Sequence, residues 1–193
     1  MMRHPLEKFR FCPVCGSAHF KEHNFKSKQC RECGFTYYAN PCSATAAFMV
    51  NDLGEMLVVR RGKEPAKGTL DLPGGFVDMY ETVEEGMRRE ISEETGLDVD
   101  EIEYLFSSPN VYEYSGIGVH TLDMDFLVLL HGDADALKAQ VRAADDAAEA
   151  LWIPISEVNP DEFGLTSIRN AVIKFLKSAD AEALTSAVGN QHR

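Results

Sequence analysis

The feature that most constrains the fold is the segment from Gly75 to Leu97, GFVDMYETVEEGMRREISEETGL. Thr82 and Glu85 have the T-x-x-E spacing of a capping box, in which each side chain accepts a hydrogen bond from the other residue's backbone at the start of a helix. Gly96 stands where a helix would end in a left-handed residue, a conformation that glycine adopts without steric cost. The segment therefore predicts a helix over residues 82–95 that follows a glycine-containing loop.

Three glutamates share one face of this expected helix. Glu90, Glu93 and Glu94 fall within an arc of about 100°, because each residue turns an α-helix by about 100°. A solvated acidic face would explain their charge, but not the glycines and the arginine at fixed offsets from them. A divalent cation such as Mg²⁺ prefers hard oxygen ligands, and it binds carboxylates together with substrate phosphates. We therefore expect a cation here, with Gly74 and Gly75 letting the backbone approach it and Gly86 leaving the helix face open to a diphosphate.

The spacing of this segment resembles the Nudix box, with Gly75, then Glu81, then Arg89 to Leu97 in register. The resemblance implies an α+β fold, an α/β/α sandwich with a mixed β-sheet, and hydrolysis of a diphosphate bond by metal-activated water. It implies that Glu90 and Glu94 ligate Mg²⁺ or Mn²⁺ and that Glu93 is a further ligand or a proton acceptor. The resemblance gives the other fixed positions, Gly75, Glu81, Arg89 and Gly96, a structural role, with Arg89 and Glu81 bracing the loop as an ion pair.

Four of the five cysteines form two pairs, Cys12 with Cys15 and Cys30 with Cys33, each with the C-x2-C spacing and each followed by glycine. Zn²⁺ in structural sites favours four thiolates in a tetrahedron, and each such turn presents two sulfurs to one ion. The pairs therefore predict a structural zinc ribbon. The fifth cysteine, Cys42, has no partner in this pattern, and we expect it to be a small buried residue.

The first forty residues are also distinct in charge and aromatic content. They contain seven basic and three acidic residues, whereas the remainder contains 12 basic and 28 acidic ones. Seven aromatic residues lie among them: Phe9, Phe11, Phe20, Phe25, Phe35, Tyr37 and Tyr38. They can form a stacking platform for nucleic acid, or they can be the core of a module too small to fold without metal; we expect the core.

The ribbon placed ahead of the box is similar to the NADH pyrophosphatase branch of the Nudix family. In that branch a glutamate in an E-A-x-W stretch is a metal ligand, and the stretch Glu149-Ala150-Leu151-Trp152 carries the role over to Glu149. The same resemblance implies that the Gly74 carbonyl is a further metal ligand. Asp145 and Asp146 are alternative candidates for the role of Glu149, but no motif of that branch matches them. The S-Q-P-W run typical of that branch is absent, because this chain has Ser107-Ser108-Pro109-Asn110 instead. In the loop expected after this run, Tyr112 or Tyr114 can stack on a base or simply pack.

Hydrophobic patterning predicts the rest of the fold. Strands are expected at residues 44–50, 56–61, 70–72, 102–106, 121–130 and 150–155, and a last helix at 165–177. Together with the shift in charge near Asn40, they predict a zinc ribbon at 1–40, a Nudix domain at 41–178 and a polar tail at 179–193.

The expected substrate is a small nucleoside-diphosphate-linked molecule of the NAD(H), ADP-ribose or nucleotide-sugar class. Removal of an NAD cap from RNA and a non-catalytic nucleotide sensor whose ribbon contacts nucleic acid or protein remain alternatives. A body this acidic weighs against a long nucleic-acid footprint. No apolar run approaches the roughly 20 residues that cross a bilayer, and the first residues lack the apolar core of a signal peptide, so we expect a cytoplasmic protein. A homodimer is possible, although no stretch identifies an interface.

Overall fold

The computed structural model describes residues 4–114, 116–142 and 147–184. The chain divides into two compact units, of which one comprises Met1–Cys42 with Pro109–Leu122 and the other Ser43–Ser108 with Asp123–Arg193. No helix among the described residues is both long enough and apolar enough to cross a membrane. Each unit is described by itself below.

The first unit contains a small antiparallel sheet in the order β1-β2-β3. Its strands are β1 (Phe20–Asn24), β2 (Ser27–Cys30) and β3 (Thr36–Tyr38). The buried apolar cluster is small: it consists of Cys12, Phe20 and Cys30, with Phe35 packed against it. A core of this size cannot offset the entropy of ordering the module without a further constraint.

The second unit is built on a six-stranded sheet in the order β6-β5-β4-β8-β7, with β9 paired to β5. Its strands are β4 (Cys42–Asn51), β5 (Glu55–Arg61), β6 (Leu70–Asp71), β7 (Glu103–Tyr114), β8 (Ile117–Leu130) and β9 (Ala147–Pro154). β5 pairs antiparallel with β4, β6 and β9, and an isolated bridge joins Leu70 and Phe163 in parallel. The ends of β7 and β8 nearest their turn belong to the first unit.

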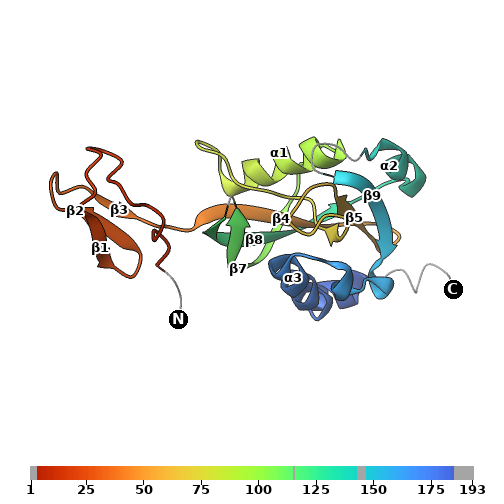
Figure 1. Cartoon of the computed structure of the whole chain (residues 1–193). Helices are drawn as coiled ribbons and strands as arrows, with labels where there is room; N and C mark the ends of the chain where they lie inside the picture. The colour runs from red at the N-terminus through yellow and green to blue at the C-terminus, as the bar shows by residue number, and fades with distance from the viewer. Residues whose placement is uncertain (1–3, 115, 143–146, 185–193) are drawn as a thin grey trace. The chain divides into compact units, whose positions relative to one another are not determined.

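Helices cover both faces of this sheet (Figure 1). They are α1 (Val83–Thr95), α2 (Ala134–Gln140) and α3 (Thr166–Leu176), with short 3-10 turns η1 (Ile155–Glu157) and η2 (Pro160–Glu162). Neighbouring residues of β4 point to opposite faces, so that Met49 packs with Met87 and Ile91 of α1, whereas Phe48 stacks on Phe175 of α3 with ring centroids 4.2 Å apart. The expected α/β/α sandwich is confirmed.

Several expectations about single segments were wrong. β7 continues to Tyr114, so residues 107–114 are strand rather than loop, and α2 was not foreseen. Cys42 is exposed at the first position of β4 instead of buried. The tail, for which a weak helix or disorder is expected, is helical at 179–184, where Ala181 is 3% exposed and packs on the core; its remainder, 185–193, lies outside the described residues.

Two acidic side chains are buried among the described residues of the second unit, Asp71 and Asp125. Asp125 on β8 is only 1% exposed, and its Oδ2 atom has no hydrogen-bond partner among the described residues. Burial raises the pKa of Asp125 to about 7, the charge of Asp123 adds to the rise, and Lys174 opposes it. Asp125 is therefore protonated over part of the acidic range in which an ordinary aspartate is ionised.

Candidate metal site

The helix that carries the three glutamates begins and ends as its sequence predicts. Thr82 Oγ1 accepts a hydrogen bond from Glu85 N at 3.2 Å, and Glu85 Oε2 accepts one from Thr82 N at 2.6 Å. Gly96 ends the helix with a φ of 73°. Met87 and Ile91 are fully buried against the sheet, which fixes the rotation of α1 and turns the opposite face outward. The capping box and the glycine cap are both confirmed.

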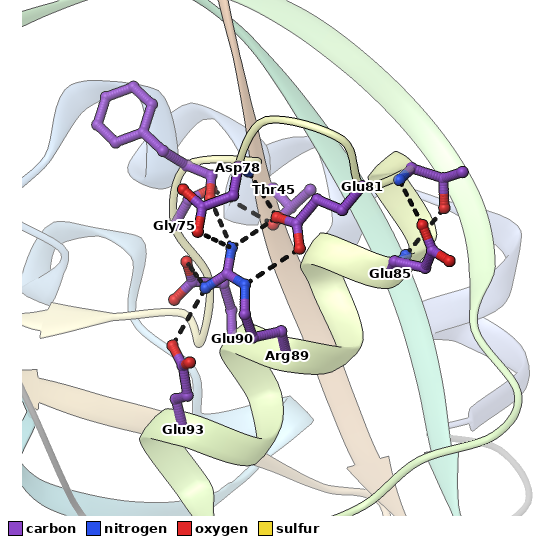
Figure 2. A network of polar contacts seen from close by, with 10 residues as sticks. Thr45, Gly75, Asp78, Glu81, Glu85, Arg89, Glu90 and Glu93 are labelled. Atoms are coloured by element: carbon purple, nitrogen blue, oxygen red, sulfur yellow. Dashed lines mark hydrogen bonds and ion pairs between the residues drawn. The ribbon is translucent and has the colours of Figure 1, made fainter.

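Arg89 is the centre of the polar network on this outward face (Figure 2). Its Nη1 donates to Glu90 Oε1 at 2.8 Å and to Glu93 Oε2 at 3.1 Å. Its Nη2 donates to Glu81 Oε1 at 2.7 Å and to the Phe76 carbonyl at 3.0 Å, and its Nε donates to Glu81 Oε2 at 3.2 Å. The expected ion pair between Arg89 and Glu81 is present, and it is bidentate, the geometry that fixes a guanidinium most firmly.

The loop before the helix supplies partners that the sequence analysis missed. Asp78 N donates to Glu81 Oε1 at 2.5 Å, and the Asp78 carboxylate lies 4.0 Å from Arg89 Nη2. Hydrogen bonds from Arg89 and from the Asp78 backbone lower the pKa of Glu81, which keeps it ionised against the guanidinium. In the sequence, these partners could have been suspected only from their location, because Phe76 and Asp78 both lie in the loop between Gly75 and Glu81.

Glu90 is more enclosed than Glu93. Its side chain is 15% exposed, compared with 53% for Glu93. Burial raises the pKa of Glu90, the Arg89 hydrogen bond and charge lower it, and the charges of Glu93 and Glu81 raise it further. A cation bound at this carboxylate would favour its ionised form, so the electrostatics suit a metal ligand.

The glycine pair passes through crowded space, where a side chain on Gly75 would displace the Glu90 carboxylate and one on Gly74 would meet the backbone of β4. A Cβ on Gly75 would lie 2.6 Å from Glu90 Oε1, and one on Gly74 would lie 2.1 Å from the Thr45 carbonyl. Gly74 N donates to Glu94 Oε2 at 3.0 Å, which draws the third glutamate to the same loop. The carbonyls of Pro73 and Gly75 accept from β4, at 2.8 Å each.

The Gly74 carbonyl lies between those two paired carbonyls, and no donor to it is found in the described part of the chain. Its lone pairs thus remain available for a cation. The expected role of Gly86 was wrong: a Cβ there would lie 2.9 Å from Glu81 Oε1, so Gly86 makes room for the Glu81 carboxylate rather than for a diphosphate.

Glu149 lies on β9 and is not part of the Arg89 network. It is opposite Arg60 of β5 in the strand register, and Arg60 Nε donates to Glu149 Oε2 at 3.0 Å. Its side chain is 52% exposed, so it can exchange this partner for another at little cost. Its rivals Asp145 and Asp146 lie outside the described residues.

The four paired cysteines converge on one point in the first unit. Their sulfur atoms all lie within 4.8 Å of one another, with Cys12 Sγ 3.7 Å from Cys33 Sγ and Cys15 Sγ 3.6 Å from Cys30 Sγ. A tetrahedron of thiolates around Zn²⁺ has sulfur–sulfur edges of about 3.8 Å, given Zn–S bonds of about 2.3 Å.

The two cysteine turns are built alike. Gly16 N donates to the Cys12 carbonyl at 2.9 Å and Gly34 N to the Cys30 carbonyl at 3.1 Å. Both glycines have a positive φ, 73° and 76°, which other residues adopt only under strain. The backbone amides of Cys33 and Glu32 lower the pKa of Cys30 to about 6, whereas the pKa of Cys15 is raised to about 12: the backbone at Ser17 lowers it, but burial and the sulfurs of the other three cysteines raise it. The cluster can hold one tetrahedral ion.

Most aromatic residues of the ribbon lie outside its core, contrary to expectation. Phe20 is buried and Phe35 half-buried, but the other five are exposed: Phe9 39%, Phe11 62%, Phe25 82%, Tyr37 43% and Tyr38 45%. Cysteine side chains occupy the centre of so small a module, which leaves room for few rings.

Tyr112 and Tyr114 lie two residues apart on β7, in the part of that strand that belongs to the first unit. Their rings stack on each other with centroids 6.4 Å apart and an interplanar angle of 23°. Tyr114 is 63% exposed. The pair therefore packs ring against ring at the surface of a strand, with Tyr114 the more exposed of the two.

Comparison with known proteins agrees with this geometry. The chain belongs to the NUDIX domain family, which matches residues 40–174. It is 31% identical over 159 residues to the NAD-capped RNA hydrolase NudC of Vibrio vulnificus, an alignment that covers 81% of this chain and 55% of that protein. It is 33% identical over 126 residues to the ADP-ribose pyrophosphatase of Methanocaldococcus jannaschii, covering 64% of this chain and 68% of the relative.

A solved structure with the same fold is a NUDIX hydrolase from Nitrosomonas europaea. It superimposes with a TM-score of 0.63 at 19% identity and covers 89% of this chain and 92% of its own. The chain spans about half the length of the NudC protein that it matches.

Proposed function

We propose that this protein hydrolyses the diphosphate bond of a small nucleoside-diphosphate-linked molecule, of the NAD(H), ADP-ribose or nucleotide-sugar class. One observation carries the proposal: Glu90 and Glu94 both meet the Gly74–Gly75 backbone, since a Cβ on Gly75 would lie 2.6 Å from Glu90 Oε1 and Gly74 N donates to Glu94 Oε2 at 3.0 Å. Backbone and carboxylates this close form a cluster of oxygen ligands that suits Mg²⁺ or Mn²⁺.

The proposed ligands are Glu90, Glu94 and the Gly74 carbonyl, with Glu93 as a further ligand or the acceptor of a proton. A divalent ion held by them would lower the pKa of a bound water and take up charge on the diphosphate oxygens. Arg89 positions these groups rather than reacting, because Glu81 fixes one side of its guanidinium while the other side reaches Glu90 and Glu93. Glu149 would join the site by leaving Arg60.

The proposed domain organisation is a structural zinc ribbon at 1–40, a catalytic domain at 41–178 and a tail at 179–193. The spacing of the four sulfurs supports zinc in the ribbon. The two relatives, an NAD-capped RNA hydrolase and an ADP-ribose pyrophosphatase, support a nucleoside diphosphate as the group recognised. Removal of an NAD cap from RNA is the second candidate, because the relative with that function matches 81% of the chain.

The test is hydrolysis of a panel with Mg²⁺ or Mn²⁺: NADH, NAD⁺, ADP-ribose, FAD, nucleotide-sugars, diadenosine polyphosphates and NAD-capped RNA. Glu94→Gln removes a proposed ligand, and Glu84→Gln is its matched control on the exposed first turn of α1. Turnover lost in Glu94→Gln and kept in Glu84→Gln supports the proposal and names the substrate. A protein with its zinc bound that binds a nucleotide but hydrolyses nothing would instead be a sensor.

A further inference from the structure

A hollow on the zinc ribbon has no place in the chemistry of the glutamate site. Its volume is about 650 Å³, and residues of β1, β2 and the segment before the first cysteine line it. The charged residues of its lining are three basic ones, Arg10, Lys21 and Lys28, and one acidic one, Glu22. The hollow thus carries a positive charge in a protein whose formal net charge is −12.

Lys28 is the residue that makes this hollow more than a basic surface. It is only 7% exposed, and its Nζ donates to the carbonyls of Phe9 at 3.0 Å and Glu7 at 3.5 Å. Among the described residues no carboxylate forms an ion pair with it, although Glu22 stands opposite it in the β1–β2 register and lines the same hollow, so its ammonium bonds only to neutral carbonyls. An ammonium has three donors, and two of them are used. A buried cation without a partner is costly, and an anion bound in the hollow would remove that cost.

Phe11 supplies a second kind of contact at the same place. Its ring lines the hollow, is 62% exposed and stacks on no other described ring. By contrast, the ring of Phe9 stacks on Tyr37, with centroids 6.2 Å apart. An exposed ring costs free energy in water unless something covers it, and a flat partner next to a buried cation is what a nucleotide offers.

We propose that this hollow binds single-stranded nucleic acid, with a backbone phosphate held by Lys28, Arg10 and Lys21 and a base stacked on Phe11. Sequence-tolerant binding of single strands combines these two contacts, a basic groove for the backbone and aromatic faces for the bases. A duplex hides its base faces and cannot use Phe11. The proposal concerns binding by the ribbon, so it stands or falls independently of the proposed hydrolysis.

The test is binding of the full-length, zinc-loaded protein to short fluorescent oligouridylate and oligothymidylate strands at low salt. Phe11→Ala is compared with Phe25→Ala, which removes an exposed ring at the β1–β2 turn, outside the hollow. Lys21→Ala is compared with Lys26→Ala, which removes the same charge from the β1–β2 turn, outside the lining. Zinc content and circular dichroism establish that each variant is folded.

Phe11→Ala should weaken binding about tenfold, since stacking of one base is worth about 1–3 kcal/mol. Lys21→Ala should weaken it several-fold and reduce the slope of log K against log salt by about 0.7. The two control variants should stay within about twofold of the wild type. A duplex of the same length should bind at least about tenfold more weakly than the single strand.

Three results would overturn the proposal. One is no binding of either strand at low salt, and another is equal loss in the hollow variants and their controls. The third is binding of inorganic polyphosphate or phosphatidylserine vesicles as tightly as the strands and without sensitivity to Phe11→Ala, which would make the hollow a general anion site. Similar affinity for oligouridylate and oligothymidylate supports the proposal, because the proposed contacts involve the phosphate and the base but not the 2′-hydroxyl.

Discussion

The two candidate metal sites of this chain are built in opposite ways. At the cysteine cluster, two short turns bring four sulfurs within 4.8 Å, and the apolar core around them is minimal. At the glutamate site, the carboxylates stand on a helix that a large core already holds, and Arg89 neutralises part of their charge. The first ion is therefore expected to be needed for folding and the second only for chemistry, which is the difference between structural and catalytic metal sites.

The comparison is tested most severely by removing zinc. Cys30→Ser combined with a chelator should unfold the ribbon, because zinc in small modules contributes about 10 kcal/mol or more of folding free energy. Hydrogen exchange should show β1–β3 losing protection while β4 and β5 keep theirs. If the amides of β1–β3 stay protected without metal, the ribbon has another source of stability and the contrast between the sites fails.

Glu90→Gln breaks the other site and should have the reverse effect. We expect hydrolysis to fall by about 10³-fold, because a cation held by this carboxylate stabilises the transition state by several kcal/mol. The free energy of unfolding should change little, since the helix is anchored by its buried face. Steady-state kinetics with denaturant titration on the same samples measures both. A Glu90→Gln protein that melts early but turns over normally would reverse the assigned roles.

Asp125 sharpens the contrast by making the second unit sensitive to pH rather than to metal. Its pKa is raised to about 7 by burial and by Asp123, against Lys174, so the folded state binds its proton more tightly than the unfolded state does. Its burial penalty is therefore complete above pH 7 and is relieved as the pH falls from about 7 toward 4.

Asp125→Asn should remove this pH dependence. The stability that the variant gains over the wild type should be about 2 to 4 kcal/mol larger at pH 8 than at pH 5, given about 1.4 kcal/mol per pH unit. Urea unfolding at the two pH values measures it. Asp161→Asn, an exposed aspartate of η2, is the control and should leave the pH dependence unchanged. Identical pH profiles for Asp125→Asn and the wild type would mean that Asp125 is ionised in the folded state without penalty.

The smallest expected effect concerns the cap that positions the glutamates. Thr82→Ala removes one half of the capping box and should cost about 1 kcal/mol of stability. Thr82→Ser keeps the hydroxyl and should restore most of it. Thermal unfolding of the pair measures the difference. Equal loss in both variants would assign the effect to the methyl group and not to the cap.

Short-range geometry was predictable from the sequence alone. The capping box, the left-handed Gly96 and the two cysteine turns depend on contacts between residues a few positions apart, so fixed spacing determines them. The α/β/α layering was also predictable, because strand and helix periodicities differ along the chain. The metal roles of the box glutamates, of Glu149 and of the cysteines stay predictions that the experiments above address.

Contacts between distant segments were decided only by the tertiary structure. Gly86 makes room for Glu81, Glu149 meets Arg60 across two strands, and Asp125 becomes buried with one oxygen unpaired. The outward rings of the ribbon belong to the same group, since Phe11 is exposed while Cys12, Phe20 and Cys30 form the buried cluster of the module. Each outcome depends on which residues the fold brings together from separate parts of the chain, and local spacing carries no information about that choice.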